Sequence, residues 1–92
     1  MEDDEFEWDD AKAAANIKRH RIGFPQARRV FRDPFVFTKL DETEDYGEDR
    51  YIAIGLVGEL ILAVAFTERG IRIRIISARK ANSNEQREYH SS

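Results

Sequence analysis

The stretch that decides the fold is RYIAIGLVGELILAVAFT, residues 50–67. Its two halves, 50–57 and 60–67, are apolar on both alternating faces, which is typical of central strands that are covered on both sides. Gly58-Glu59 separates them, and glycine at the first central position of a two-residue loop indicates a type II′ hairpin. The stretch therefore predicts two antiparallel strands at the centre of a sheet, not a membrane span.

Strand patterns continue outward from this hairpin on both sides. Residues 35–40, FVFTKL, and residues 71–77, IRIRIIS, alternate with a period of two. A turn is expected at 68–70, and residues 5–8, EFEW, have the composition of a short edge strand. The central sheet is thus predicted to be an antiparallel meander of about four strands.

Helix signals lie before and after the strands. Asp9 is placed to cap a helix over 10–20, in which Ala11, Ala14, Ala15 and Ile17 form a modest apolar side. A second helix is expected from Phe24 to Asp33-Pro34, and Asn82 with Glu85 fits the capping box of a short C-terminal helix. These elements predict one α+β domain over residues 1–92, in which the helices pack on one face of a twisted sheet. Residues 1–5 are expected to be an acidic, disordered tail.

The charge is unevenly distributed along the chain. The formal net charge is −3, but seven acids fall in residues 1–10 and six in residues 41–49, which leaves five acids against fifteen Lys and Arg elsewhere. A basic body attracts polyanions, chiefly nucleic acid, although both signs of charge could instead pair locally. The chain has no cysteine, no signal-peptide pattern and no predicted membrane span, so a cytoplasmic location is expected.

Arginines interrupt the last predicted strand. Alternation sends Ile71, Ile73 and Ile75 to the face that meets the helices, and Arg72, Arg74 and Ile76 to the open face. Arg79 and Lys80 continue the positive charge at the end of this strand. Guanidinium groups held by a sheet suit bidentate phosphate binding, but cross-strand pairing with Glu48, Asp49 or Glu59 is an equal alternative.

His20 lies among the cations of KRHR, at the end of the first predicted helix. It is a candidate general base, and the alternative is that it only caps the helix C-terminus through the dipole. The two histidines have no zinc-ligand spacing, and no P-loop, GxGxxG or GxSxG motif occurs.

Three segments resemble a known family. FEWDDAKAAANIKRHRIGFPQARRVF (6–31), DRYIAIG (49–55) and IRIISARKA (73–81) are similar to the BrnT family, the toxin half of BrnT/BrnA toxin–antitoxin modules. The resemblance extends from Phe6 to Tyr89. It implies a RelE-like fold and a metal-independent endoribonuclease, without a cofactor, that arrests translation. It also implies a ribbon-helix-helix antitoxin of the BrnA type in a two-plus-two assembly, with operator DNA contacted only through that antitoxin.

The resemblance also implies site residues. The family pattern covers Trp8, Asp9, Lys12, Asn16, His20, Glu48, Arg50, Arg69, Arg74, Ser77, Arg79 and Lys80, and departs from this chain at Arg21, where glycine is usual. RNA cleavage needs a base for the ribose 2′-OH, cations for the phosphorane and an acid for the leaving oxygen. Arg74 and Arg79 are the predicted cations, His20, Lys18 or Glu48 the base, Tyr89 or Lys80 the acid, and Lys18, Arg50, Arg69 and Arg72 further RNA contacts. The alternative function is a non-catalytic basic module that docks an acidic protein or nucleic acid.

Overall fold

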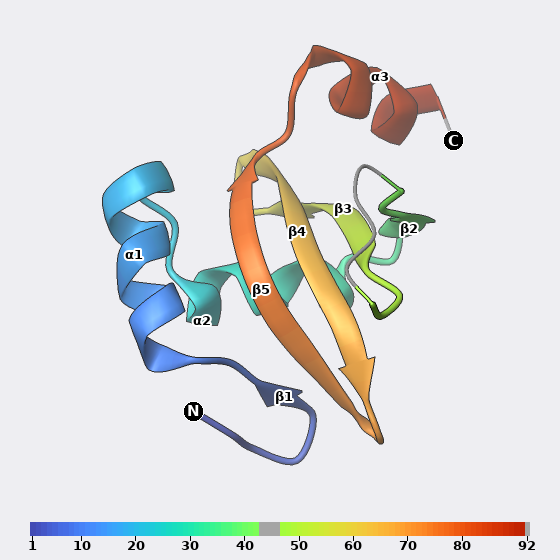
Figure 1. Ribbon diagram of the computed structural model, residues 1–92. Coiled ribbons are helices and arrows are strands. Elements are labelled where there is room, and N and C mark those ends of the chain that lie inside the picture. Colours follow the sequence, from blue (N-terminus) through green and yellow to red (C-terminus); the bar gives the residue numbers. More distant parts are fainter. Residues whose placement is uncertain (43–46, 92) are drawn as a thin grey trace.

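The computed structural model describes residues 1–42 and 47–91 as a five-stranded mixed sheet with helices (Figure 1). The strand order is β1-β5-β4-β3-β2, and only β1 runs parallel to its neighbour. In chain order the elements are β1 (Phe6–Glu7), α1 (Asp10–His20), α2 (Phe24–Ala27), the 3₁₀ helix η1 (Arg28–Arg32), β2 (Phe37–Leu40), β3 (Tyr51–Val57), β4 (Leu60–Arg69), β5 (Arg72–Lys80) and α3 (Ser83–Ser91). The predicted α+β class is confirmed, with one more strand than the meander of four.

The central hairpin forms where the sequence predicts it. Val57 pairs with Leu60 across Gly58-Glu59, and Gly58 has a φ of +62° that suits glycine. The next turn is also a two-residue turn, Gly70-Ile71, and not the predicted 68–70. Ile71 therefore lies in the turn with 90% of its surface exposed, and its predicted place among the core isoleucines is wrong.

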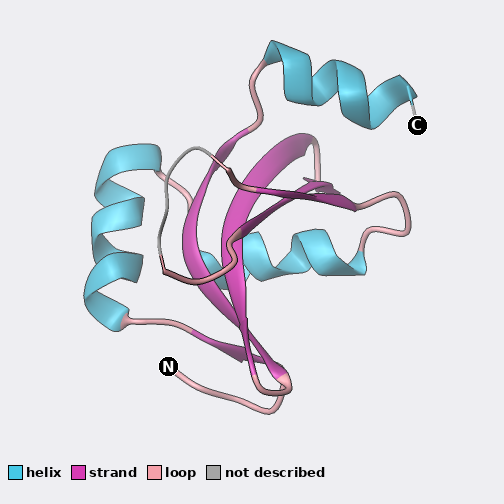
Figure 2. Ribbon diagram, turned by 45° about the vertical axis from the view of Figure 1, so that its right-hand side comes forward, coloured by secondary structure: helices cyan, strands magenta, loops and turns pink. Residues whose placement is uncertain are grey.

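Helices cover both faces of the sheet (Figures 1 and 2). α1, α2 and η1 cover one face, where Phe24, Val30 and Val64 are fully buried. On the other face, Tyr89 of α3 packs with Ile54 and Ala63. The predicted placement of all helices on one face is wrong, because β3 and β4 are apolar on both sides and each side needs a cover.

The N-terminal segment adds the fifth strand. β1 pairs in parallel with β5, with Phe6 opposite Ile73 and Glu7 opposite Arg74. Asp3 accepts hydrogen bonds from the backbone N–H groups of Glu5 and Phe6, and forms a 3.1 Å ion pair with Arg28. The segment for which the sequence predicts disorder thus makes defined contacts in the structure.

A buried amide attaches α1 to the sheet. Asp9 caps the helix as predicted by accepting from the N–H of Lys12, but the predicted apolar side is exposed, and Ile17 keeps 52% of its surface. Asn16 faces the sheet instead. Its Nδ2 donates to the carbonyls of Ile22 and Ala78 at 2.9 Å each, and its Oδ1 accepts from the N–H of Ala78 at 3.0 Å. The helix packs through hydrogen bonds where an apolar stripe was expected.

The helix ends in the left-handed conformation. Arg21 has φ 59° and ψ 32°, and its N–H donates to the carbonyl of Ile17 at 2.8 Å. A non-glycine residue there costs about 1 kcal/mol or more. This cost falls at Arg21, the position where the resemblance implies a glycine.

Asn16→Asp should destabilise the domain strongly, because it removes both amide donors and leaves a charge beside two buried carbonyls. We expect a loss of at least about 2 kcal/mol, or roughly 8–16 °C in Tm for a domain of this size. Thermal melts followed by circular dichroism measure this. Ala15→Asp, which adds the same side chain one residue earlier on the exposed side, should cost about 0.5 kcal/mol. Equal losses in the two variants would show that the Asn16 hydrogen bonds do not hold α1 in place.

Candidate functional site

Five arginines gather on the sheet face opposite α1 and η1. We call this surface the arginine face. Arg69 on β4 pairs with Arg72 on β5, and Thr67 pairs with Arg74. Glu48 lies 3.7 Å from both the Arg50 Nε and an Arg69 amino group. The arginine face consists of Arg50, Arg69, Arg72, Arg74 and Arg79.

A β-bulge brings Arg79 to the same face as Arg74. The two residues are an odd number of positions apart, so a regular strand would point them to opposite faces. The register shifts between Ala65, which pairs with Ser77, and Phe66, which pairs with Ile75. Ile76 is the extra residue, and the alternation changes phase there. Arg79 then lies opposite Ala63, whereas Arg74 lies opposite Thr67 on the same side of β4.

Arg74 is held by the parallel strand β1. Its NH1 donates to Glu7 Oε2 at 2.7 Å, and the Glu7 side chain is only 16% exposed. Arg72 is anchored nearby, because its Nε donates to the Asp3 carbonyl at 2.7 Å and its NH2 lies 3.3 Å from Glu2. Ion pairing does occur, as one alternative predicts, but these partners come from the N-terminal segment and not from Glu48, Asp49 or Glu59.

Arg79 is tied to the start of α3. Its two amino groups donate to Glu85 at 2.6 and 2.9 Å, and the Glu85 side chain is 5% exposed. Glu85 also accepts from the N–H of Asn82, whose side chain accepts from the N–H of Glu85, so the predicted capping box is confirmed. The hydrogen bonds from Arg79 lower the pKa of Glu85 despite its burial, and the same pair raises the pKa of Arg79. Arg79 therefore joins β5 to α3.

A hollow of about 200 Å³ lies beside Arg79 on this face. Its floor has small side chains, Ala63, Ala65 and Ser77, and Asp41 and Ile52 complete the lining. Because the side chains of the floor are small and the rim carries a guanidinium group, a phosphate group can enter the hollow and accept hydrogen bonds from Arg79.

Three predicted site residues lie away from the arginine face. Lys18 and His20 belong to α1, which covers the opposite side of the sheet. Lys80 pairs with the buried Leu62, a core residue of the side that α1 covers, so its side chain leaves β5 on that side. Of the candidates for acid and base, Glu48 alone lies among the arginines.

Tyr89 has a structural contact. Its hydroxyl donates to Asp33 Oδ2 at 2.5 Å, and this hydrogen bond with burial raises its pKa to about 12. Burial raises the pKa of Asp33, but the bonds from Tyr89 and from the N–H groups of Leu56 and Phe35 outweigh it and lower the pKa. A tyrosine held in this way releases its proton less readily than a free one.

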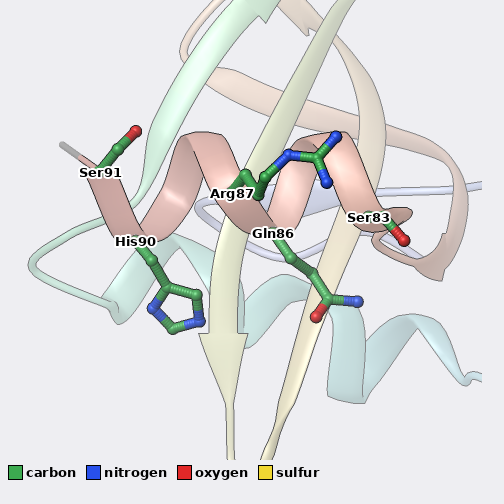
Figure 3. Close-up of a pocket in the computed structure, with 5 residues that line it drawn as sticks. All are labelled: Ser83, Gln86, Arg87, His90 and Ser91. Atoms are coloured by element: carbon green, nitrogen blue, oxygen red, sulfur yellow. The ribbon is translucent and has the colours of Figure 1, made fainter.

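The outer side of α3 carries a separate shallow pocket (Figure 3). It is lined by Ser83, Gln86, Arg87, His90 and Ser91. Helical spacing places most of these residues on the other side of α3 from Glu85 and Tyr89. His90 and Arg87 therefore face away from the arginine face.

Sequence reasoning missed the carboxylates that hold the arginines. The sequence predicts that Glu85 caps the last helix, but its bonds to Arg79 depend on how the chain turns after β5. Glu7 belongs to the acidic stretch 1–10, and its contact with Arg74 depends on a parallel pairing between residues 67 positions apart. Neither contact has a local sequence signal.

The comparison with protein families gives one match. A family model described as the ribonuclease toxin BrnT of type II toxin–antitoxin systems matches residues 8–85, most of the chain. No curated protein sequence matches the chain significantly. Within residues 1–42 and 47–91, no helix is long and apolar enough to cross a membrane, and no three acidic or histidine side chains are grouped to hold a metal ion.

Glu85→Gln should lower stability at neutral pH, because it weakens the pair with Arg79. Arg79 is 38% exposed, so solvent weakens the pair and we expect a loss of about 1–2 kcal/mol. The lowered pKa of Glu85 means that its contribution is present at neutral pH and is lost as pH falls below the ordinary range of a glutamate. The Tm gap between wild type and Glu85→Gln should therefore narrow from pH 7 to pH 3.

The matched control is Glu88→Gln on the same helix. Glu88 forms an exposed pair with Lys39 at 3.2 Å, and its loss should change the Tm little at either pH. If the Glu85→Gln and Glu88→Gln proteins have the same Tm at pH 7, the proposed strength of the Arg79–Glu85 pair is contradicted.

Proposed function

The chain belongs to the BrnT family of ribonuclease toxins of type II toxin–antitoxin systems, and from this membership we propose that it is a RelE-like endoribonuclease that cleaves RNA without a metal ion. The observation that carries the proposal is the β-bulge at Ile76, which brings Arg74 to the same face as Arg79, the arginine that lines the hollow. Bulges that redirect side chains are frequent next to active sites.

Arg74 and Arg79 are proposed to stabilise the charge of the phosphorane. A guanidinium group has five N–H donors. Arg74 gives one amino group to Glu7, and Arg79 gives two to Glu85, so both retain donors for a phosphate oxygen. The carboxylates fix the guanidinium groups before RNA arrives, which reduces the reorganisation needed at the transition state.

Glu48 is the proposed general base. Its carboxylate lies between Arg50 and Arg69 at 3.7 Å from each, which is too long for a hydrogen bond and leaves its oxygens able to accept a proton. His20 and Lys18 lie on the helix side and are supported less. No acid is assigned, because the Lys80 side chain leaves β5 on the side that α1 covers and the Tyr89 hydroxyl is held by Asp33. Arg50, Arg69 and Arg72 are proposed to contact RNA around this centre.

A second candidate function is a module that docks an acidic protein segment without cleaving RNA. It is favoured by one observation: every member of the arginine face already has a carboxylate partner, in Glu2, Glu7, Glu48 or Glu85. A partner's acidic side chains could replace these carboxylates in kind. An RNA cleavage assay separates the two candidates.

The protein's antitoxin is proposed to be a BrnA-type ribbon-helix-helix protein that binds the arginine face and masks it from RNA. Such antitoxins are dimers, so each dimer can hold one toxin at either end, and operator DNA is contacted only through the antitoxin. The assembly would act in the cytoplasm, where RNA is the substrate.

Arg74→Ala should abolish cleavage while the domain stays folded. With labelled RNA and EDTA, wild type should cleave, and the variant should lose about 10²–10³ in rate, as when one transition-state donor is removed. Arg79→Ala should lose as much activity and also melt earlier, because it leaves the buried Glu85 without its partner. Glu7→Gln is the control, because it removes the carboxylate partner of Arg74 but leaves the positive charge of Arg74 in place.

If Arg74 serves only to hold β1, then Arg74→Ala and Glu7→Gln should both melt early and both cleave normally per folded molecule. Wild-type protein that leaves RNA intact in EDTA, but cleaves it with Mg²⁺, would refute the metal-independent mechanism. Protein that cleaves under neither condition would favour the docking module.

The stoichiometry can be tested on the co-expressed pair. Light scattering should give the mass of two toxins and two antitoxins, because each ribbon-helix-helix dimer has two equivalent ends. A mass that corresponds to unequal numbers, or to one of each, would refute the proposed assembly.

A further inference from the structure

A second basic surface lies on the face of the sheet that α1 and η1 cover, where few carboxylates pair with the Lys and Arg side chains. Residues 11–32 contain seven Lys and Arg and no Asp or Glu. Of these seven, only Arg28 forms an ion pair with a described residue, at 3.1 Å from Asp3. The arginine face is different, since all five of its members are paired. The unpaired charge of the domain is thus concentrated away from the proposed cleavage site.

Six unpaired cations lie toward one end of the sheet, and we call them the basic end. The Asn16 bonds to Ala78 place the last turn of α1 beside the last residues of β5 (Figure 1). Lys80 leaves β5 on the side that α1 covers and pairs with Leu62, two residues after the Val57–Leu60 pair. The hairpin glycine Gly58 lines a hollow together with Arg29, Arg32 and Asp33, and the Asp33 carboxylate is already held by Tyr89 and by backbone N–H groups. The basic end consists of Lys18, Arg19, Arg21, Arg29, Arg32 and Lys80.

The members of the basic end are free to bind an anion. All six are exposed, and none makes an ion pair or a side-chain hydrogen bond with residues 1–42 or 47–91. The α1 C-terminal dipole favours cations in the last turn, but it does not act on Arg29, Arg32 or Lys80. Unpaired like charges repel one another, so a neutralising partner would bind with a gain that the paired arginine face cannot give.

We propose that the basic end binds the phosphate backbone of the RNA substrate and supplies most of its electrostatic affinity. This inference rests on the proposed ribonuclease function, because it concerns the same RNA. Cations distributed over a helix end, a strand end and a 3₁₀ helix match the regularly repeated charge of a nucleic-acid chain. The basic end then captures RNA, and the arginine face acts on the phosphate that enters its hollow.

The test measures binding of 2′-O-methyl RNA, which lacks the attacking hydroxyl and is not cleaved. The triple variant Arg19→Ala, Arg21→Gly, Arg29→Ala should weaken binding about tenfold or more at low salt. Because each phosphate contact contributes about 0.7 to the salt slope for a single strand, the slope of log K against log salt should fall in magnitude by about 2. None of these three residues is proposed to take part in catalysis, and glycine suits the left-handed position of residue 21.

The matched control is Lys12→Ala, Lys39→Ala, Arg87→Ala, which removes three cations outside the basic end. It should leave the salt slope nearly unchanged. Equal slopes in the two triple variants would overturn the inference, since net charge alone would then explain the binding. So would absence of 2′-O-methyl RNA binding by wild type, or a triple variant that binds this RNA normally but loses the antitoxin. Cleavage in EDTA is read separately, so failure of the proposed ribonuclease function is distinguished from failure of the basic end.

Discussion

The hydrogen bonds of Asn16 are the constraint on which the rest of the structure depends. One buried amide satisfies both backbone groups of Ala78 and the carbonyl of Ile22, so it fixes α1 to β5 and also fixes the chain that leaves the helix. β5 is the strand that carries Arg74 and Arg79. A domain of 92 residues has little surplus stability. A polar contact that is fully satisfied therefore defines the position of α1 more sharply than the short apolar side of an alanine-rich helix could.

The acidic N-terminus is part of the site because its carboxylates neutralise the arginines of β5. Five guanidinium groups on one face of the sheet would repel one another if they had no carboxylate partners. Glu2 and Glu7 neutralise Arg72 and Arg74 because β1 runs parallel to β5 and brings them alongside. The formal net charge of −3 therefore does not show how the charges are distributed: carboxylates pair with the cations of the arginine face and leave those of the basic end unpaired.

The parts of the fold that have a local signal could be predicted from the sequence. Gly58-Glu59 requires a tight turn, Asp9 and Asn82 with Glu85 satisfy free helix N–H groups, and Asp33-Pro34 ends a helix; all of these lie where they were expected. The geometry of the site, in contrast, depends on contacts between residues that are far apart in the sequence. The extra residue Ile76 inverts the alternation of β5, and nothing in IRIRIIS marks which residue is unpaired. β3 and β4 are apolar on both faces, so the sequence pattern is compatible with α3 on either face of the sheet and does not predict which one it covers.

The division between paired and unpaired cations follows from what each must do. A guanidinium that stabilises a transition state needs a fixed direction, and a carboxylate within 3 Å gives it that direction at the expense of attraction at long range. A cation that captures RNA needs the opposite, because attraction across solvent depends on uncompensated charge and not on orientation. One surface cannot meet both demands. The structure separates them by the thickness of the sheet, with the oriented arginines on the side that α3 partly covers and the uncompensated cations on the side of α1 and η1. The acid-free segment 11–32 and the acid-rich segment 1–10 are neighbours in sequence, so the short strand β1 is enough to send the carboxylates to one side and leave the other side positive.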